Sequence, residues 1–120
     1  MSLRELLESL IGRIEGAHAI MLMGRDCIAV DEVRRDTAGF DVQAMAVEYA
    51  TVVKDIRRSI DVVGAGDLEE MTVTTANAVM VVRILNEEFF AVMVLSRDAN
   101  PGKARFLLST VVPELIRSVE

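Results

Sequence analysis

The chain has 120 residues, of which 52% are hydrophobic and 27% charged, and a formal net charge of −6. This length suits one domain, and the hydrophobic share excludes an intrinsically disordered chain. The negative charge argues against nucleic acid and anionic membrane as partners, because both require a basic surface. With one cysteine, Cys27, and no apolar run of membrane-spanning length, we expect a single cytoplasmic domain over residues 1–120 with no membrane insertion.

The N-terminal third predicts a helix followed by a hairpin. Ser2 and Glu5 have the spacing of a capping box, and the apolar residues after them recur at helical spacing as far as Gly16. Residues 17–23 are almost wholly apolar and predict a buried strand. Residues 24–26 predict a turn, residues 27–30 a short return strand, and the polar residues 31–39 a loop.

A long second helix is expected to start at the cap residue Asp41 and to reach about Val63. At about 100° per residue, its core-facing sector is predicted to hold Val42, Met45, Ala46, Tyr49, Val52, Val53, Ile56 and Ile60. The opposite side carries charged residues and, among them, a stripe of small residues at Ala44, Val47 and Thr51.

Three strands and a third helix are predicted for the rest of the chain. Residues 68–75 are rich in threonine and predict a strand with one wetter face, whereas residues 79–85 and 89–95 are mostly apolar. Asn100 as cap and Pro101 as first residue predict the start of the last helix, in which Pro113 should produce a bend.

These elements predict an α/β domain of the α+β type with a five-stranded antiparallel sheet. The three most apolar strands belong in the middle of the sheet, and short connections favour hairpins, so the expected strand order is 2-1-5-4-3. The first and third helices should share one face, and the long helix should cross the other face alone.

The long helix looks too narrow for its face of the sheet. Five strands span roughly 24 Å, whereas one helix covers about 10 Å. We therefore expect uncovered apolar sheet surface, and a homodimer that covers it. The predicted dimer interface uses the second helix and the edge strand, at Ala44, Val47, Thr51, Arg58, Met71, Val73 and Thr75.

No set of residues predicts catalysis, metal binding or a cofactor. His18 lies in a mostly apolar strand and is interpreted as a packed or hydrogen-bonded residue, and Cys27 as an inert thiol. Asp67, Glu69 and Glu70 are interpreted as a solvated face rather than a metal site. The chain is therefore not expected to be an enzyme.

The whole chain resembles the roadblock/dynein light chain family, particularly its single-domain bacterial and archaeal members. The resemblance rests on the order of the elements and on three segments, IEGAHAIMLMGRD, GDLEEMTVTTANAVMVVRILNEEFFAVMVLS and RDANPGKARFLL. Two departures are Cys27, where the family often has glycine, and Pro113 within the last helix. The resemblance implies a homodimer through paired second helices and third strands. It also implies a scaffold or regulator of a small Ras-like GTPase, similar to a bacterial gliding-motility regulator that stimulates GTP hydrolysis by its partner.

The expected partner-binding residues lie on the exposed side of the second helix, at Glu48, Lys54, Asp55 and Arg57. The resemblance implies that such proteins reshape the switch regions of the GTPase rather than insert a catalytic residue. Two alternatives stay open from the residues alone: a ligand sensor of the PAS or GAF type, and a pure assembly subunit. The aromatic content of 4% argues against the sensor, whose cavity is usually lined by aromatic side chains.

Overall fold

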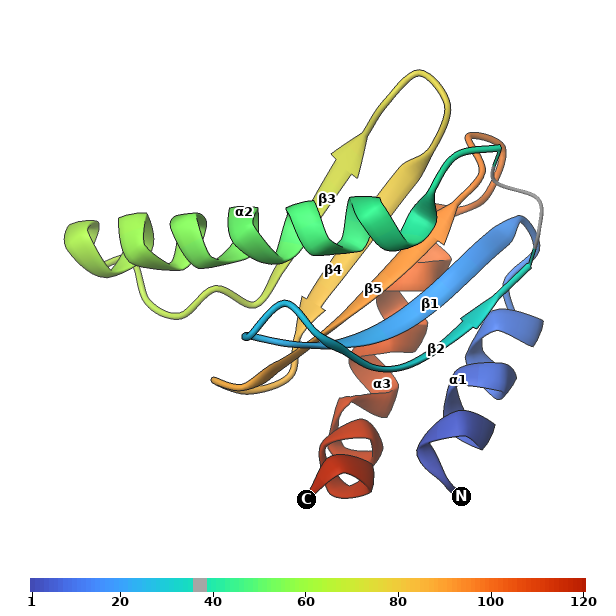
Figure 1. Cartoon of the computed structure of the whole chain (residues 1–120), viewed down its shortest axis with the longest axis horizontal. Helices are drawn as coiled ribbons and strands as arrows, with labels where there is room; N and C mark the ends of the chain where they lie inside the picture. Colours follow the sequence, from blue (N-terminus) through green and yellow to red (C-terminus); the bar gives the residue numbers. More distant parts are fainter. Residues whose placement is uncertain (36–38) are drawn as a thin grey trace.

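The structure is a computed structural model, which describes residues 1–35 and 39–120. Three helices and five strands follow one another in the order α-β-β-α-β-β-β-α (Figure 1). They are α1 (Leu3–Gly12), β1 (Ala17–Gly24), β2 (Ala29–Arg34), α2 (Val42–Val63), β3 (Glu70–Thr74), β4 (Val79–Ile84), β5 (Phe89–Leu95) and α3 (Pro101–Val119).

The five strands form one antiparallel sheet in the order β2-β1-β5-β4-β3, which confirms the predicted order. The central strand β5 pairs with β1 through Met21 and Val92, and with β4 through Val82 and Val92. These central strands are buried on both faces, as their continuous apolar runs predicted.

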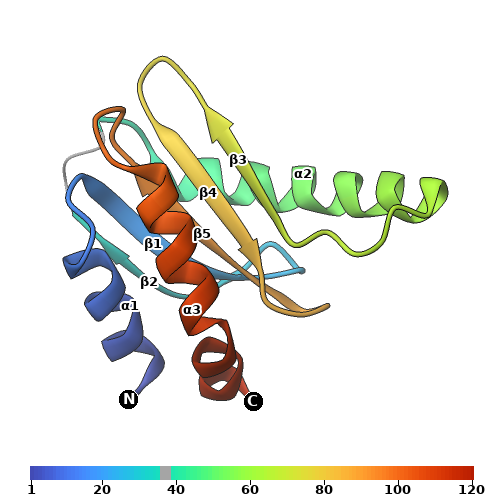
Figure 2. The ribbon, with the colours of Figure 1, turned by 180° about the vertical axis from the view of Figure 1, so that it is seen from behind.

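Two separate apolar clusters hold the helices on the sheet (Figures 1 and 2). On one face α1 and α3 pack against the sheet through residues such as Leu7 and Leu108, which are fully buried. On the other face α2 packs alone, chiefly through Ala46, Ala50 and Val53. The predicted distribution of helices over the two faces is confirmed.

The predicted caps are present at all three helices. Ser2 Oγ accepts from the Glu5 amide, and the Ser2 amide donates to Glu5 Oε1 at 3.1 Å, which completes the capping box. The hydrogen bond from the Ser2 amide to the Glu5 carboxylate, followed by the contribution of the Ser2 side chain, holds the pKa of the Glu5 carboxyl below its ordinary value. Asp41 and Asn100 cap α2 and α3, and α3 continues through Pro113.

The second strand differs from its prediction. It was expected at residues 27–30 with a loop from 31 to 39, but β2 runs from Ala29 to Arg34 and only residues 36–38 lie outside the described part. The prediction ended the strand too early because most residues after Val30 are polar. Asp31 and Glu32 are tolerated in an edge strand because they are half-exposed, and Asp31 receives the Arg4 guanidinium of α1.

The turn between β1 and β2 places a non-glycine residue in the left-handed region. Cys27 has φ 68°, its amide donates to the Gly24 carbonyl at 3.0 Å, and Asp26 Oδ1 accepts from the Ile28 amide at 3.1 Å. This is the position at which the family resemblance implies glycine, and the backbone conformation supplies the reason.

We expect Cys27→Gly to raise the free energy of unfolding by about 0.5–1 kcal/mol, because glycine has no Cβ to strain this conformation. Cys27→Val should lower it, since a β-branched side chain fits the left-handed region poorly. Urea titrations of the three proteins at one concentration measure both shifts. A Gly variant that is less stable than the wild type would show that thiol packing outweighs the strain.

The expectation of bare apolar sheet under α2 is wrong for the central strands. Met21, Val82 and Val92 point to the α2 face and are fully buried in the single chain. Small residues on the inner side of α2, Ala46 and Ala50, let the helix lie close enough to cover them. Part of the exposed apolar surface instead lies on the outside of α2.

Candidate protein-binding surface on helix α2

Helix α2 meets the sheet through most of the predicted sector, displaced slightly toward Ala50. The buried line runs through Val42, Ala46, Ala50 and Val53, and the predicted residues Met45, Tyr49, Ile56 and Ile60 are half-buried, so the helix is only slightly rotated from the expected sector. Val52 was placed among the core residues but is 41% exposed, and Ala50 was overlooked but is buried. This orientation decides which side chains of α2 face outward.

The outward side of α2 carries a continuous stripe, which we call the outer stripe. It consists of Ala44, Val47, Thr51, Arg58 and Val62, which are all exposed. Four of these five are predicted interface residues, so the structure brings the helical part of that prediction together on one surface. Val47 and Val62 are 43% and 83% exposed, which is unusual for valine.

The C-terminal turns of α2 extend past the sheet. The helix crosses the sheet and continues beyond β3, so that its last turns lie outside the rest of the molecule (Figures 1 and 2). Val63, at the very end, is 73% exposed, and Gly64 closes the helix with a left-handed φ of 67°. The sequence prediction missed Val62 and Val63 because helical spacing alone does not show where the sheet ends.

Strand β3 is an open edge beside α2. Thr75 N donates to the Ala78 carbonyl and Ile84 N donates to the Glu69 carbonyl, so the alternation of an antiparallel ladder turns the backbone groups of residues 70, 72 and 74 outward. Thr72 and Thr74 have exposed side chains, which confirms the predicted wetter face. The edge can therefore accept another strand.

The three predicted interface residues of β3 have different positions. Met71 and Val73 point to the α2 side and are half-buried against its apolar cluster. Thr75 follows the strand, and its Oγ1 accepts from the amides of Asn77 and Ala78 to form the turn into β4. The Thr75 hydroxyl is thus used in hydrogen bonds within its own turn, whereas Met71 and Val73 lie in the open edge strand β3.

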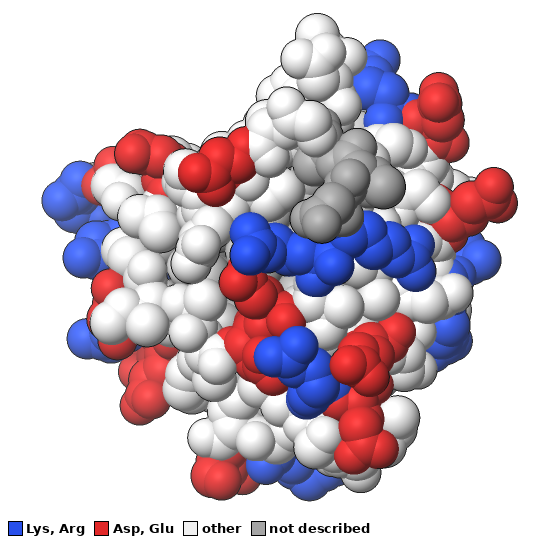
Figure 3. Space-filling model, turned by 45° about the vertical axis from the view of Figure 1, so that its right-hand side comes forward, with Lys and Arg blue, Asp and Glu red and all other residues white. Residues whose placement is uncertain are grey.

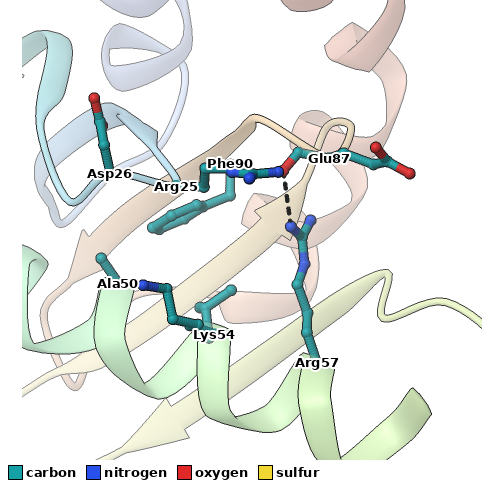
Figure 4. A pocket seen from close by; sticks show the side chains of 8 residues that line it. Arg25, Asp26, Ala50, Lys54, Arg57, Glu87 and Phe90 are labelled. Carbon is teal, nitrogen blue, oxygen red and sulfur yellow. Dashed lines mark hydrogen bonds between the residues drawn. The ribbon is translucent and has the colours of Figure 1, made fainter.

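The predicted partner-binding residues fall into two groups. Glu48, Lys54 and Asp55 are exposed around the outer stripe, and Asp55 pairs with Arg58 at 2.9 Å. Arg57 is half-buried and lies on the sheet side of the helix. Its Nη1 donates to the Glu87 carbonyl at 3.1 Å (Figure 4), and its Nη2 donates to the Asn86 carbonyl at 2.8 Å.

We expect Arg57→Ala to lower the free energy of unfolding by about 1–2 kcal/mol, because both carbonyls lose a charged donor and the β4–β5 turn loses its connection to α2. Arg58→Ala, one residue further along, is the control. Arg58 and Asp55 are 75% and 57% exposed, so the loss of their ion pair should change stability by less than about 0.5 kcal/mol. Equal effects in chemical denaturation would contradict this assignment.

Glu70 corrects another sequence interpretation. It was grouped with Asp67 and Glu69 as a solvated face, but its carboxylate accepts from Arg105 Nε of α3 at 3.0 Å and lies 3.6 Å from Arg83 Nη1 of β4. The hydrogen bonds that the Arg105 guanidinium donates to the Glu70 carboxylate raise the pKa of Arg105. Glu70 therefore ties β3 to β4 and α3, while Asp67 and Glu69 are exposed.

The charges visible on the side of β2 and α1 are mixed. Figure 3 shows basic and acidic side chains interleaved there rather than gathered into a patch of one sign. Across residues 1–35 and 39–120, no cluster of three His, Cys, Asp or Glu side chains is placed to hold a metal ion. In the same described ranges, no helix combines the length and the apolar character that a membrane crossing requires.

The arrangement of the sheet and the three helices matches solved structures over nearly the whole chain. MglC from Myxococcus xanthus is 34% identical, with 96% of this chain and 97% of that chain covered and a TM-score of 0.68. A roadblock/LC7 domain from Streptomyces avermitilis is 15% identical, with 99% and 98% covered and a TM-score of 0.84. The gliding protein MglB from Thermus thermophilus is 18% identical, with 97% and 87% covered and a TM-score of 0.83.

These similarities define the class as a small α+β domain of roadblock type. No family model and no curated protein matches the sequence. MglC is 34% identical over almost the full length of both chains, so this match indicates membership of the same family. The other two structures are 15% and 18% identical and indicate only a shared fold. The chain belongs to the roadblock/LC7 family, which confirms the resemblance found in the sequence.

Proposed function

We propose that this chain is a non-enzymatic cytoplasmic homodimer that binds a small Ras-like GTPase and acts as its scaffold or regulator. The observation that carries the proposal is the outer stripe of α2, an exposed row of four small or apolar side chains and Arg58, bordered by charges of both signs. Such a row lets a second helix approach closely. The open edge of β3 beside it gives the same second copy a strand to pair with.

The GTPase is proposed to bind the charged rim of the paired helices. Glu48, Lys54 and Asp55 stay exposed beside the outer stripe. A mixed-charge rim around an apolar centre suits recognition that depends on complementarity and association rate. That the partner is a GTPase follows from the family resemblance, since the residues alone indicate only a protein-binding surface.

The position of Arg57 bears on the mechanism. An arginine finger must place its guanidinium on the phosphates of the partner, but Arg57 uses two donors on the carbonyls of the β4–β5 turn. Arg58 is exposed, but it belongs to the outer stripe and forms an ion pair with Asp55. We therefore propose that any stimulation of hydrolysis comes from reshaping the switch regions of the GTPase.

The test is a binding titration of purified small GTPases from the same genome, each loaded with GDP and with a non-hydrolysable GTP analogue. We expect one GTPase to bind with a preference for one nucleotide state, and the charge reversal Glu48→Lys to weaken binding at least about tenfold. Glu114→Lys, an exposed reversal on α3, is the control and should leave binding unchanged.

Single-turnover hydrolysis in the saturated complex tests the mechanism. Arg58→Ala should weaken binding without abolishing turnover once the complex is saturated. Loss of turnover in a fully bound Arg58→Ala complex would identify a catalytic arginine and refute the reshaping mechanism. If no GTPase binds in either state, the GTPase role is wrong and the pure assembly subunit replaces it.

A further inference from the structure

A pocket of about 430 Å³ lies between α2 and the turns at one end of the sheet (Figure 4). Its lining comes from three places in the chain: the β1–β2 turn, the middle of α2, and the β4–β5 hairpin. This volume is within the range of small-molecule sites. The lining residues are Arg25, Asp26, Ala50, Val53, Lys54, Arg57, Glu87 and Phe90.

The floor of this pocket is apolar. Ala50 and Val53 come from the buried line of α2, and Phe90 comes from β5 with only 2% of its surface exposed. In Figure 4 the Phe90 ring lies between Arg25 on the sheet side and Lys54 on the helix side. A bound molecule would thus rest its apolar part on these three side chains.

The rim contains more available cations than anions. No ion pair found among the described residues involves Arg25, Lys54 or Arg57. Asp26 accepts from the Ile28 amide within its own turn, and its carboxylate and that of Glu87 point away from the space in Figure 4. Arg25, Arg57 and Glu87 also line an adjoining pocket of about 280 Å³, and Asp61 and Asp67 line that pocket but not this one.

The three cations are brought together by the orientation of α2 on the sheet. Arg57 is fixed through the carbonyls of Glu87 and Asn86 and retains further N–H donors. Lys54 lies one turn earlier on the same helix, and the backbone amide of Arg25 donates to the Glu88 carbonyl, which fixes the base of that side chain. In a chain of net charge −6, this is a local concentration of positive charge.

We propose that this pocket binds an organic anion, a carboxylate or phosphate attached to an apolar body. The anionic group would meet Arg25 and Lys54, and the apolar body would rest on Ala50, Val53 and Phe90. The source is either a free small acid or a carboxylate carried by a partner protein. The pocket lies within one chain, so binding does not require self-association; it shares only Lys54 with the proposed GTPase-binding rim, and the small-molecule titration is done without a GTPase.

The test titrates the protein with two anionic probes, 3-phenylpropionate and phenylphosphate, and with 3-phenylpropan-1-ol as the matched uncharged compound. Binding is followed by the chemical shifts of the backbone amides. We expect the anions to bind at least about tenfold more tightly than the alcohol, with the largest shifts at residues that line the pocket. Lys54→Met and Arg25→Met should each weaken binding of the anions at least about fivefold. Arg58→Met, an exposed cation outside the pocket, should not.

Two peptides then distinguish the sources. Acetyl-Gly-Gly-Phe with a free terminal carboxylate presents the chemistry of a protein terminus, and its C-terminal amide removes the charge. Tighter binding of the acid peptide than of phenylpropionate supports a protein-borne carboxylate, and the reverse order supports a free small acid. Equal binding of anions and alcohol, full affinity in Lys54→Met, or no saturable binding would overturn the proposal. Repeating the titration with Val47→Asp separates this result from dimerisation.

Discussion

Val47→Asp should convert the dimer into a monomer at micromolar concentration, with a dimer dissociation constant raised at least about 100-fold. Val47 lies in the middle of the outer stripe and is 43% exposed in the single chain. A carboxylate there would be buried without a partner when two helices pair. The same exposure means that the isolated chain should tolerate the change with little loss of stability.

The sign of the introduced charge gives a sharper result. If the two-fold axis passes near Thr51, position 47 of one copy lies close to Asp55 of the other, because both are four residues from Thr51. Val47→Asp should then weaken the dimer more than Val47→Lys. Sedimentation velocity over a concentration series measures both constants.

The matched control is Phe106→Asp. Phe106 is 66% exposed on α3, which lies on the opposite face of the sheet, so a charge there should leave the dimer intact. A wild-type chain that sediments as a monomer at these concentrations would refute the homodimer. Equal dissociation in the Phe106 and Val47 variants would refute the assignment of the interface to α2.

Glu70→Ala should lower the free energy of unfolding by about 2 kcal/mol. The substitution removes the carboxylate that faces Arg83 and Arg105 and leaves the half-buried Arg83 guanidinium without its partner. The value is below that of a fully buried pair, because about a quarter of each of the Glu70 and Arg83 side chains is exposed.

Two further proteins make this test specific. Glu69→Ala removes an exposed carboxylate one residue earlier and should change stability by less than about 0.5 kcal/mol. The double variant Glu70→Met with Arg83→Met should recover most of the loss, since paired apolar replacements of an ion pair are often neutral. All proteins are denatured at one concentration, because the proposed dimerisation would contribute to apparent stability. A Glu70→Ala protein as stable as Glu69→Ala would show that the network contributes nothing.

The sequence by itself determined the architecture and the starts of the helices, whereas α1 ends at Gly12 rather than at the predicted Gly16. Strands of continuous apolar residues had to lie in the middle of a covered sheet, and short connections left one strand order, which is the order observed. Ser2, Asp41 and Asn100 cap their helices through bonds to residues three positions ahead, and such local contacts are visible in a linear chain. The part of the outer stripe at Ala44, Val47 and Thr51 was also predictable, because residues three and four positions apart lie on the same side of a helix.

Only the tertiary structure decided which groups meet across the fold. The sector of α2 that faces the sheet depends on the close fit of Ala50 and on Arg57, whose carbonyl partners lie about 30 residues further along the chain. Glu70 meets Arg105 at a separation of 35 residues, and no spacing rule links them. The length of β2 was decided by its ladder with β1, because an edge strand keeps polar side chains half in solvent. Contacts of this kind arise only when distant segments pack, which is why the cationic pocket beside α2 could not be read from the chain.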